Sequence, residues 1–292
     1  MSTQNKIQVL RTPEELRRWH TAQRRADKRI GFVPTMGALH DGHVSLVKEA
    51  QKHADSVIAS IFVNPTQFAP NEDFDSYPRT LDSDLEKLEA AGCCAAYCPV
   101  ARDLYPEGDA TKVYVEGLSS ILEGEHRPHF FGGVTNIVSR LFIHVAPDVA
   151  VFGQKDYQQL MIIKRMVKDL GMAVEIIGAP TIREKDGLAM SSRNQYLSAD
   201  ERTKAGNFAG ALRKAASSIE SGESIKASID QALKDIATAG LGPINYVAVR
   251  NADTLAPLES DTLEKGTNAR ILTAAWMGKT RLIDNLPLAG KK

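Results

Sequence analysis

The sequence of 292 residues has little of several features that mark whole classes of protein. It carries 36 basic and 36 acidic residues, so its formal net charge is zero, and no long block of one sign interrupts it. This balance argues against the basic surface that binds nucleic acids and acidic membranes. No apolar run approaches the roughly 18 residues of a membrane-spanning helix. We therefore expect small molecules or other protein chains as partners, with no nucleic acid and no membrane.

Cysteine is also scarce, and the three that occur, Cys93, Cys94 and Cys98, fall in one short segment. An odd, crowded set is not a disulfide framework, and no fourth cysteine or nearby histidine completes a zinc site. We expect these residues to be small buried side chains at the start of a strand. Unpaired thiols fit a reducing compartment, and residues 1–20 lack the apolar core of a signal peptide. Both features predict a cytoplasmic protein.

Several catalytic signatures are absent as well. The chain has no G-x-S-x-G string and no Ser–His–Asp motif, which argues against a serine hydrolase. It has neither a Walker A loop nor a G-x-G-x-x-G string, so two common phosphate-binding loops are excluded. With no obvious covalent nucleophile, we expect chemistry that depends on positioning and on charge stabilisation.

The first part of the chain alternates strand and helix patterns. Apolar runs of strand length lie at 30–33, 56–63, 93–100, 148–153 and 173–180. Helical patterns lie at 13–28, 44–54, 81–88, 134–145 and 157–170. This alternation predicts an α/β fold with a Rossmann-like, doubly wound parallel sheet. We assign residues 1–180 to this nucleotide- and substrate-binding domain.

The character of the chain changes near residue 180. A polar connection, 180–198, precedes two helical patterns at 199–220 and 224–239. Strand patterns at 244–255, 269–277 and 280–285 then follow one another closely, with a hairpin turn at Gly278–Thr280. We therefore expect residues 181–292 to form a smaller α+β C-terminal domain that acts as a lid.

Polar strings follow three of the predicted parallel strands. PTMGALHDGH follows 30–33, NPTQF begins at the end of 56–63, and GQKD comes at the end of 148–153. The carboxyl ends of parallel strands lie at one edge of a sheet, where such folds bind ligands. We therefore expect the three strings to meet there.

The first string places two histidines around a turn at the start of a helix. Gly37 and Gly42 allow a tight turn and close approach of the backbone to a ligand. His40 and His43 are three residues apart and point the same way. Two imidazoles beside a helix N-terminus suit a triphosphate, because both can donate to phosphoryl oxygens. A pair of helix-capping histidines and a zinc site are the alternatives, although no third zinc ligand is spaced to match.

Two further strings also suit phosphate. Lys155 supplies a compact positive charge, Asp156 can accept hydrogen bonds from ribose hydroxyls, and Gln159 lies one helical turn later. The alternative is a surface Lys–Asp pair. Met190 to Asn194 brings two hydroxyls and a guanidinium into the interdomain loop, which can close after ATP binds. An ordinary serine-rich turn is the alternative there.

The amides of Asn64 and Gln67 suit a different ligand. An amide can both donate and accept hydrogen bonds without carrying charge. Such groups fit a substrate with hydroxyl and carboxylate groups.

Four strings occur in one order along the chain: PTMGALHDGH, FVNPTQF, FGQKDYQQL and LAMSSRNQYLS. In that order they resemble the pantothenate synthetase (pantoate–β-alanine ligase) family. The H-x-G-H string is also similar to the signature of the nucleotidyltransferase superfamily, which class I aminoacyl-tRNA synthetases share. The resemblance continues through RPHFFGGVTNIVSRLF, PTIREKDG and the late RLIDN. It implies an ATP-dependent ligase that joins pantoate to β-alanine through a pantoyl adenylate and releases pyrophosphate and AMP.

The resemblance also implies site residues at matching positions. ATP would contact Met36, Gly37, Ala38, Leu39, His40, Asp41, Gly42, His43, Gly153, Gln154, Lys155, Asp156, Ile182, Met190, Ser191, Ser192 and Arg193. Catalytic roles would fall to His43 as proton donor and to His40, Lys155, Ser191, Ser192 and Arg193 at the phosphates. The backbone of Ile182 would meet the adenine. Pantoate would contact Gln67 and Gln159, with β-alanine near Gln67 and Asn64 as a further contact.

The chain departs from the family pattern at two places. Many relatives have glutamate where this chain has Gln154, and we expect that side chain to face outward. Residues 127–134 read RPHFFGGV, whereas many relatives read RPGHF followed by Arg-Gly-Val. We therefore assign no role to His129.

Magnesium should accompany ATP, because it neutralises the β- and γ-phosphates. Asp82 and Asp84 are candidate ligands, although carboxylates in a first helical turn commonly serve the helix dipole. The family resemblance further implies a homodimer formed by the first domain. Another H-x-G-H nucleotidyltransferase, or an ATP-binding sensor without turnover, is the rival interpretation. A tRNA synthetase fits less well, because a chain of zero net charge gives tRNA little to bind.

Overall fold

The computed structural model describes residues 6–70 and 72–290. The chain divides into two compact units. The first contains the residues up to Gln154 together with Ile162–Pro180. The second contains Lys155–Met161 and the residues from Thr181 onward. In the part of the chain that the structure describes, no helix has the length and apolar composition needed to cross a bilayer.

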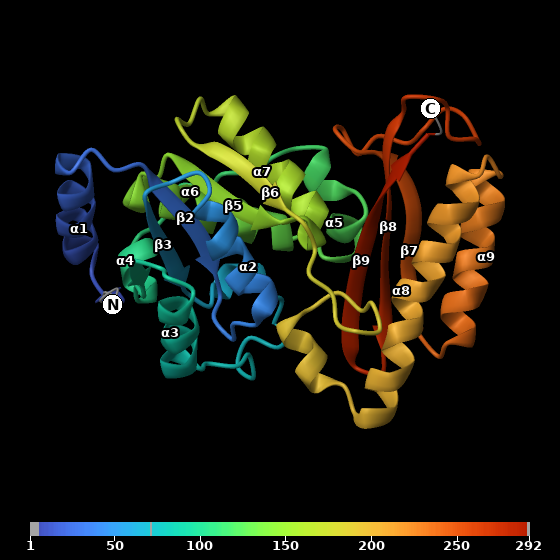
Figure 1. Cartoon of the computed structure of the whole chain (residues 1–292), viewed down its shortest axis with the longest axis horizontal. Helices are drawn as coiled ribbons and strands as arrows, with labels where there is room; N and C mark the ends of the chain where they lie inside the picture. The colour runs from blue at the N-terminus through green and yellow to red at the C-terminus, as the bar shows by residue number, and fades with distance from the viewer. Residues whose placement is uncertain (1–5, 71, 291–292) are drawn as a thin grey trace. The chain divides into compact units, whose positions relative to one another are not determined.

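A six-stranded parallel sheet organises the first unit (Figure 1). Its strands are β1 (Gln8–Leu10), β2 (Ile30–Thr35), β3 (Ser56–Ile61), β4 (Ala95–Tyr97), β5 (Val149–Gly153) and β6 (Glu175–Ala179). Their order is β1-β4-β3-β2-β5-β6. In register, Phe32 of β2 lies between Ile58 of β3 and Ala150 of β5. The predicted doubly wound sheet is confirmed.

Helices connect these strands. They are α1 (Pro13–Arg25), α2 (Asp41–Ala50), α3 (Leu81–Ala90), α4 (Ala101–Leu104), α5 (Glu123–His126), α6 (Phe130–Val145) and α7 (Tyr157–Asp169). Short 3₁₀ turns are η1 (Pro65–Gln67), η2 (Leu118–Ser120), η3 (Gln154–Asp156) and η4 (Ser192–Tyr196). The Thr12 hydroxyl accepts the Glu15 N–H at 3.2 Å and begins α1. This helix ends before the predicted residue 28, because Asp27 adopts a left-handed backbone with φ of 52°.

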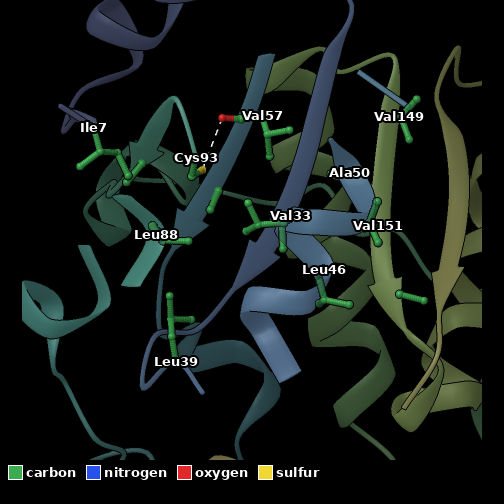
Figure 2. Close-up of a cluster of buried hydrophobic side chains, with 14 residues drawn as sticks. Ile7, Val33, Leu39, Leu46, Ala50, Val57, Leu88, Cys93, Val149 and Val151 are labelled. Atoms are coloured by element: carbon green, nitrogen blue, oxygen red, sulfur yellow. Dashed lines mark hydrogen bonds between the residues drawn. The ribbon is translucent and has the colours of Figure 1, made fainter. Parts of the chain in front are cut away.

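Alternate residues of each strand point to opposite faces of the sheet. Helices pack on both faces, so both are buried. Val33, Val57, Val149 and Val151 lie on the face that packs with side chains of α2 and α3 (Figure 2). On the opposite face, Phe142 of α6 meets the rings of Phe32 and Phe152, with both centroid distances 6.3 Å. Burial of one such side chain stabilises the fold by about 1.5–3 kcal/mol. The continuous apolar runs in the sequence reflect this double covering.

The second unit pairs two helices with an antiparallel sheet. Its elements are α8 (Ala199–Glu220), α9 (Ile225–Thr238), β7 (Ile244–Asn251), β8 (Asn268–Met277) and β9 (Thr280–Ala289). The strand order is β7-β8-β9, and Met277 pairs with Thr280 across the predicted hairpin. Apolar side chains of α8 and α9 pack on this sheet. The antiparallel strands predicted for this part of the chain are confirmed.

The cysteine segment differs from its prediction. The strand expected at 93–100 is only β4, three residues long, and the cysteines flank it. Cys93 is buried, and its thiol donates to the Val57 carbonyl at 3.4 Å (Figure 2). Burial raises the pKa of Cys93 to about 12 and that of Cys98 to about 11. Cys94 is exposed, so its predicted burial is wrong.

Candidate functional site

The sheet order locates the ligand-binding edge of the first unit. Strands β3 and β4 continue from one side of β2, and β5 and β6 continue from the other, so the order reverses between β2 and β5. In open α/β sheets, ligands bind outside the carboxyl ends of the strands at such a reversal. Met36 follows β2, Asn64 follows β3 and Gln154 follows β5. The three polar strings of the sequence therefore begin at this edge, as expected.

The segment between β2 and α2 has an unusual backbone. Gly37 and Ala38 are both left-handed, with φ of 84° and 51°. A Cβ atom on Gly37 would lie 3.1 Å from the Asp84 carboxylate and 3.2 Å from Ile61, so this position has little space as well. The side chains of Ala38 and Leu39 are buried. The side chains of these two predicted ATP contacts therefore point into the protein interior.

The two histidines bind the backbone around the start of α2. Nδ1 of His40 accepts the N–H of Gly42 at 3.1 Å, and Nδ1 of His43 accepts the N–H of His40 at 3.3 Å. Their ring centroids are 4.1 Å apart. Because both Nδ1 atoms are acceptors, each neutral imidazole carries its proton on Nε2. The pair is thus organised as two Nε2–H donors.

The amides of Asn64 and Gln67 have different surroundings. Asn64 is buried, and its Nδ2 donates to Oε1 of Gln67 at 3.1 Å and to the Gly133 carbonyl at 3.2 Å. Its Oδ1 accepts the Tyr105 hydroxyl at 2.8 Å. Nε2 of Gln67 donates to the sulfur of Met36 at 2.9 Å. Asn64 therefore holds the Gln67 amide in place, and Gln67 lies against the segment that carries the histidines.

Gly133 allows α6 to approach this turn. A Cβ atom there would lie 2.4 Å from the Thr66 carbonyl oxygen and 2.6 Å from Cα of Gln67. A Cβ atom on the neighbouring Gly132 would lie 3.7 Å from the Tyr114 ring, which is an ordinary contact distance. Gly133 therefore allows α6 to pack closely against the backbone of Gln67.

Gln154 ends this group in the first unit. Its Nε2 donates to the Gly178 carbonyl of β6 at 3.1 Å, and the side chain is half-buried. The prediction that it faces outward is therefore wrong. An amide can donate to that carbonyl, whereas an ionised carboxylate cannot, so this chain has a local reason for glutamine.

Other predicted residues belong to the second unit. The Lys155 carbonyl accepts Nδ2 of Asn285 at 2.8 Å, and its Nζ lies 3.5 Å from Oδ1 of Asp156. Oδ1 of Asn285 accepts from Arg270, whose guanidinium lies 3.8 Å from the ring centroid of Tyr157. Late strands of the chain therefore fix the backbone at Lys155.

Asp284 of β9 completes this network. It is buried and forms a two-fold ion pair with Arg183 at 2.7 and 2.9 Å. Gln159, in the first turn of α7, is half-buried. The late RLIDN string thus has a structural reason to be part of the resemblance.

The predicted adenine and phosphate segments are neighbours within the second unit. The N–H of Met190 donates to the Ile182 carbonyl at 3.0 Å. Ser191 then caps η4, because its hydroxyl accepts the N–H of Arg193 at 3.3 Å. Ser192 is buried. The structure thus places the predicted residues in two groups, one in each unit.

The two magnesium candidates differ in exposure. Asp82 is exposed, whereas Asp84 is buried and accepts the N–H groups of Ala38 and Leu39 at 3.0 and 2.8 Å. Among residues 6–70 and 72–290, no cluster of three or more histidine, cysteine, aspartate or glutamate side chains could hold a metal ion.

Sequence reasoning named Asp84 only as a magnesium candidate, and it gave no role to four other residues that support the site: Lys87, Tyr105, Arg270 and Asn285. Asp84 left a usable signal, because it lies four residues before the buried Leu88 and so on the core-facing side of α3. A carboxylate there must have partners. Tyr105 and Asn285 left no such signal, since their partners are distant in sequence.

Comparisons with known proteins agree with one another. A family model described as Pantoate-beta-alanine ligase matches residues 8–287. The pantothenate synthetase of Hyphomonas neptunium is 52% identical over 284 residues, covering 97% of this chain and 97% of that protein. The one from Caulobacter vibrioides is 50% identical, covering 95% and 97%.

Solved structures give the same result. The crystal structure of pantothenate synthetase from Thermus thermophilus matches with a TM-score of 0.89 at 43% identity, covering 96% of this chain and 99% of that one. A pantoate-beta-alanine ligase from Francisella tularensis, complexed with beta-gamma ATP and beta-alanine, matches with a TM-score of 0.79 at 33% identity, covering 96% and 97%.

Proposed function

Because this chain belongs to the pantoate–β-alanine ligase family, it joins pantoate to β-alanine to give pantothenate, and we propose which of its residues serve each step. A carboxylate oxygen of pantoate attacks the α-phosphorus of ATP, and the bond from that phosphorus to the bridging oxygen breaks, releasing pyrophosphate. The amine of β-alanine then attacks the acyl carbon of the adenylate. The amine nitrogen loses a proton, and AMP leaves.

The histidine pair carries the assignment of the phosphate site. Both Nδ1 atoms accept backbone N–H groups, so His40 and His43 can each donate from Nε2 to phosphoryl oxygens. Negative charge grows on those oxygens as pyrophosphate departs, and fixed donors stabilise it. We assign His43 as the donor nearest the chemistry and His40 to phosphate. Lys155, Ser191, Ser192 and Arg193 are assigned to the remaining phosphate oxygens.

Other predicted roles follow the same assignment. Gln67 and Gln159 bind pantoate, and Gln67 also lies near β-alanine. Support for Gln67 comes from its amide, which Asn64 holds and which lies against Met36. Asp156 is assigned to the ribose, and the Ile182 backbone to the adenine.

Magnesium enters the proposal with ATP. The residues that the structure describes offer no cluster for a resident ion, and the Asp84 carboxylate faces backbone N–H groups. We therefore assign the ion to the β- and γ-phosphates, whose charge it neutralises when bound.

Two further features belong to the proposal. A cytoplasmic location is supported by three unpaired cysteines. A homodimer through the first unit is supported by the resemblance of the four sequence strings to the family.

Pyrophosphate release by the purified protein tests the function. MgATP and pantoate should release pyrophosphate, and sustained AMP and pantothenate formation should require β-alanine. A stable nucleotide conjugate of the acceptor in place of AMP would indicate a nucleotidyltransferase of another kind. ATP binding with no pyrophosphate release under any of these conditions would indicate a sensor.

A further inference from the structure

Asp84 is a fully buried carboxylate outside the residues assigned to substrates. It lies in the first turn of α3, with 0% of its surface exposed. Its Oδ2 accepts the N–H of Ala38 at 3.0 Å, and its Oδ1 accepts the N–H of Leu39 at 2.8 Å. The Thr80 hydroxyl lies 3.2 Å from both oxygens. A buried carboxylate is costly unless its oxygens accept hydrogen bonds, and these contacts meet that need.

The segment that Asp84 holds is one that the chain would not adopt by itself. Ala38 has a φ of 51°, a left-handed conformation that is unfavourable for a residue with a side chain. The Asp84 carboxylate binds the two N–H groups that this conformation directs toward α3. Nζ of Lys87, one turn later on the same helix, donates to the Leu39 carbonyl at 2.7 Å. Helix α3 therefore binds both polar groups of Leu39.

The contact has a consequence for the next residue. His40 follows Leu39 directly, and its N–H is the group that Nδ1 of His43 accepts. A rotation of the peptides at Ala38 and Leu39 would move that N–H and with it both imidazoles. The N–H groups of Ala38 and Leu39 are meanwhile occupied by Asp84, so phosphate is left to the imidazoles and the start of α2.

The same geometry argues against a metal at this position. Both carboxylate oxygens face N–H groups, whose partial positive charge would repel a cation. A divalent ion could bind Asp84 only by displacing these donors from a buried site.

We propose that Asp84 is a positioning residue for the ligase reaction, which holds residues 37–40 in the conformation that presents His40 and His43 to ATP. This inference rests on the proposed ATP site at the two histidines. Asp84 acts through the backbone of Ala38 and Leu39 and contacts neither substrate nor magnesium.

Asp84→Asn tests the inference, because the amide keeps the volume and removes the charge and one acceptor. Its NH₂ group would face a backbone N–H. We expect the Kd for MgATP, measured by calorimetry on the full-length protein, to rise about tenfold or more. The KM for ATP should rise in parallel, while the KM for β-alanine stays within about twofold.

Glu86→Gln provides the matched control. It makes the same chemical change on an exposed position of α3 and should leave both constants at wild-type values. Lys87→Met provides a milder probe that leaves the buried carboxylate intact. It should raise the Kd for MgATP a few-fold, and this result is informative even where Asp84→Asn fails to fold.

Three results with the variants would overturn the inference while leaving the proposed ATP site in place. Wild-type MgATP affinity in both Asp84→Asn and Lys87→Met would show that the contact does not position the histidines. A uniform loss of turnover with unchanged KM for ATP would indicate a purely structural role. Recovery of Asp84→Asn at high magnesium would indicate a metal ligand. Failure of the wild-type protein to bind MgATP would instead overturn the proposed ATP site, and this inference with it.

Discussion

At the scale of single residues, the site depends on which atom of each polar side chain is already engaged. His40 and His43 use Nδ1 to accept backbone N–H groups, and that fixes Nε2 as the donor. Asn64 uses both ends of its amide within the protein, whereas the Gln67 amide is held by Asn64 and lies against the sulfur of Met36. Of these two amides, Asn64 therefore supports the site, whereas Gln67 is the one assigned to pantoate.

His43→Ala should slow turnover strongly while ATP binding survives in part. Loss of one fixed donor to a charged transition state costs on the order of 3 kcal/mol, or about two decades in rate. Pyrophosphate release with MgATP and pantoate measures the rate, and calorimetry measures ATP binding. His53→Ala, an exposed histidine just beyond α2, is the control. Adenylate formation at a near-normal rate would remove His43 from the chemistry.

Gln67→Ala should raise the KM for pantoate more than the KM for ATP. The KM for pantoate should rise about tenfold, because a hydrogen bond from a neutral amide to a charged carboxylate contributes roughly 1.5 kcal/mol or more. Steady-state kinetics with each substrate varied in turn provides the measurement. An equal rise in both constants would mean that Gln67 serves the structure of the turn and not pantoate recognition.

At the scale of elements, the turn after β3 depends on its contact with α6. That helix begins at Phe130, four residues before its predicted start, and so includes the glycine pair. The close approach at Gly133 leaves no room for a side chain beside Thr66 and Gln67. The helix is therefore part of what places the Gln67 amide.

Gly133→Ala should destabilise the protein and raise the KM for pantoate. Its Cβ atom would meet the backbone of the turn, so the two elements must separate at a cost of about 1–3 kcal/mol. Gly132→Ala is the matched control. Its Cβ atom has space, and alanine is the better helix former, so this variant should be at least as stable as the wild type. Thermal unfolding and pantoate kinetics compare the two variants, and equal stabilities would contradict the packing argument.

The sequence allowed the elements with long apolar runs to be predicted, because burial on both faces leaves a continuous pattern. The three-residue strands β1 and β4 gave no comparable pattern, so one was missed and the other was drawn too long. The histidine pair was found because glycines and spacing are local signals. The hydrogen bonds by which Tyr105, Asp84 and Asn285 support the site were not predicted. They join residues 41 to 130 positions apart, and no local pattern in the sequence indicates such contacts.

At the scale of the whole molecule, stability should depend on pH near neutrality through His144. This residue is half-buried on α6, and its Nδ1 lies 3.1 Å from the Tyr97 hydroxyl. Burial, with the charge of Arg17 second, lowers the pKa of His144 below its ordinary 6.5. As pH falls through 6.5, the unfolded chain therefore gains this proton before the folded one does.

The free energy of unfolding should accordingly decrease between pH 7.5 and pH 5.5. His144→Gln should reduce that slope, because it removes the group and keeps a polar partner for Tyr97. Tyr97→Phe should lower stability at every pH and keep the slope, since burial is the main cause of the shift. Thermal unfolding over this pH range measures all three proteins. A slope in His144→Gln equal to that of the wild type would assign the effect to other groups.

The link from Asn285 to the Lys155 carbonyl also sets an order of events during synthesis. The ribosome makes the parallel strands and both histidines long before it reaches β9. Until β9 emerges, the carbonyl of the lysine assigned to phosphate lacks its hydrogen bond from Asn285. A nascent chain that stops short of residue 285 therefore carries most of the assigned residues and lacks the amide that fixes one of them. The placement of Lys155 therefore depends on a strand that is made well after it.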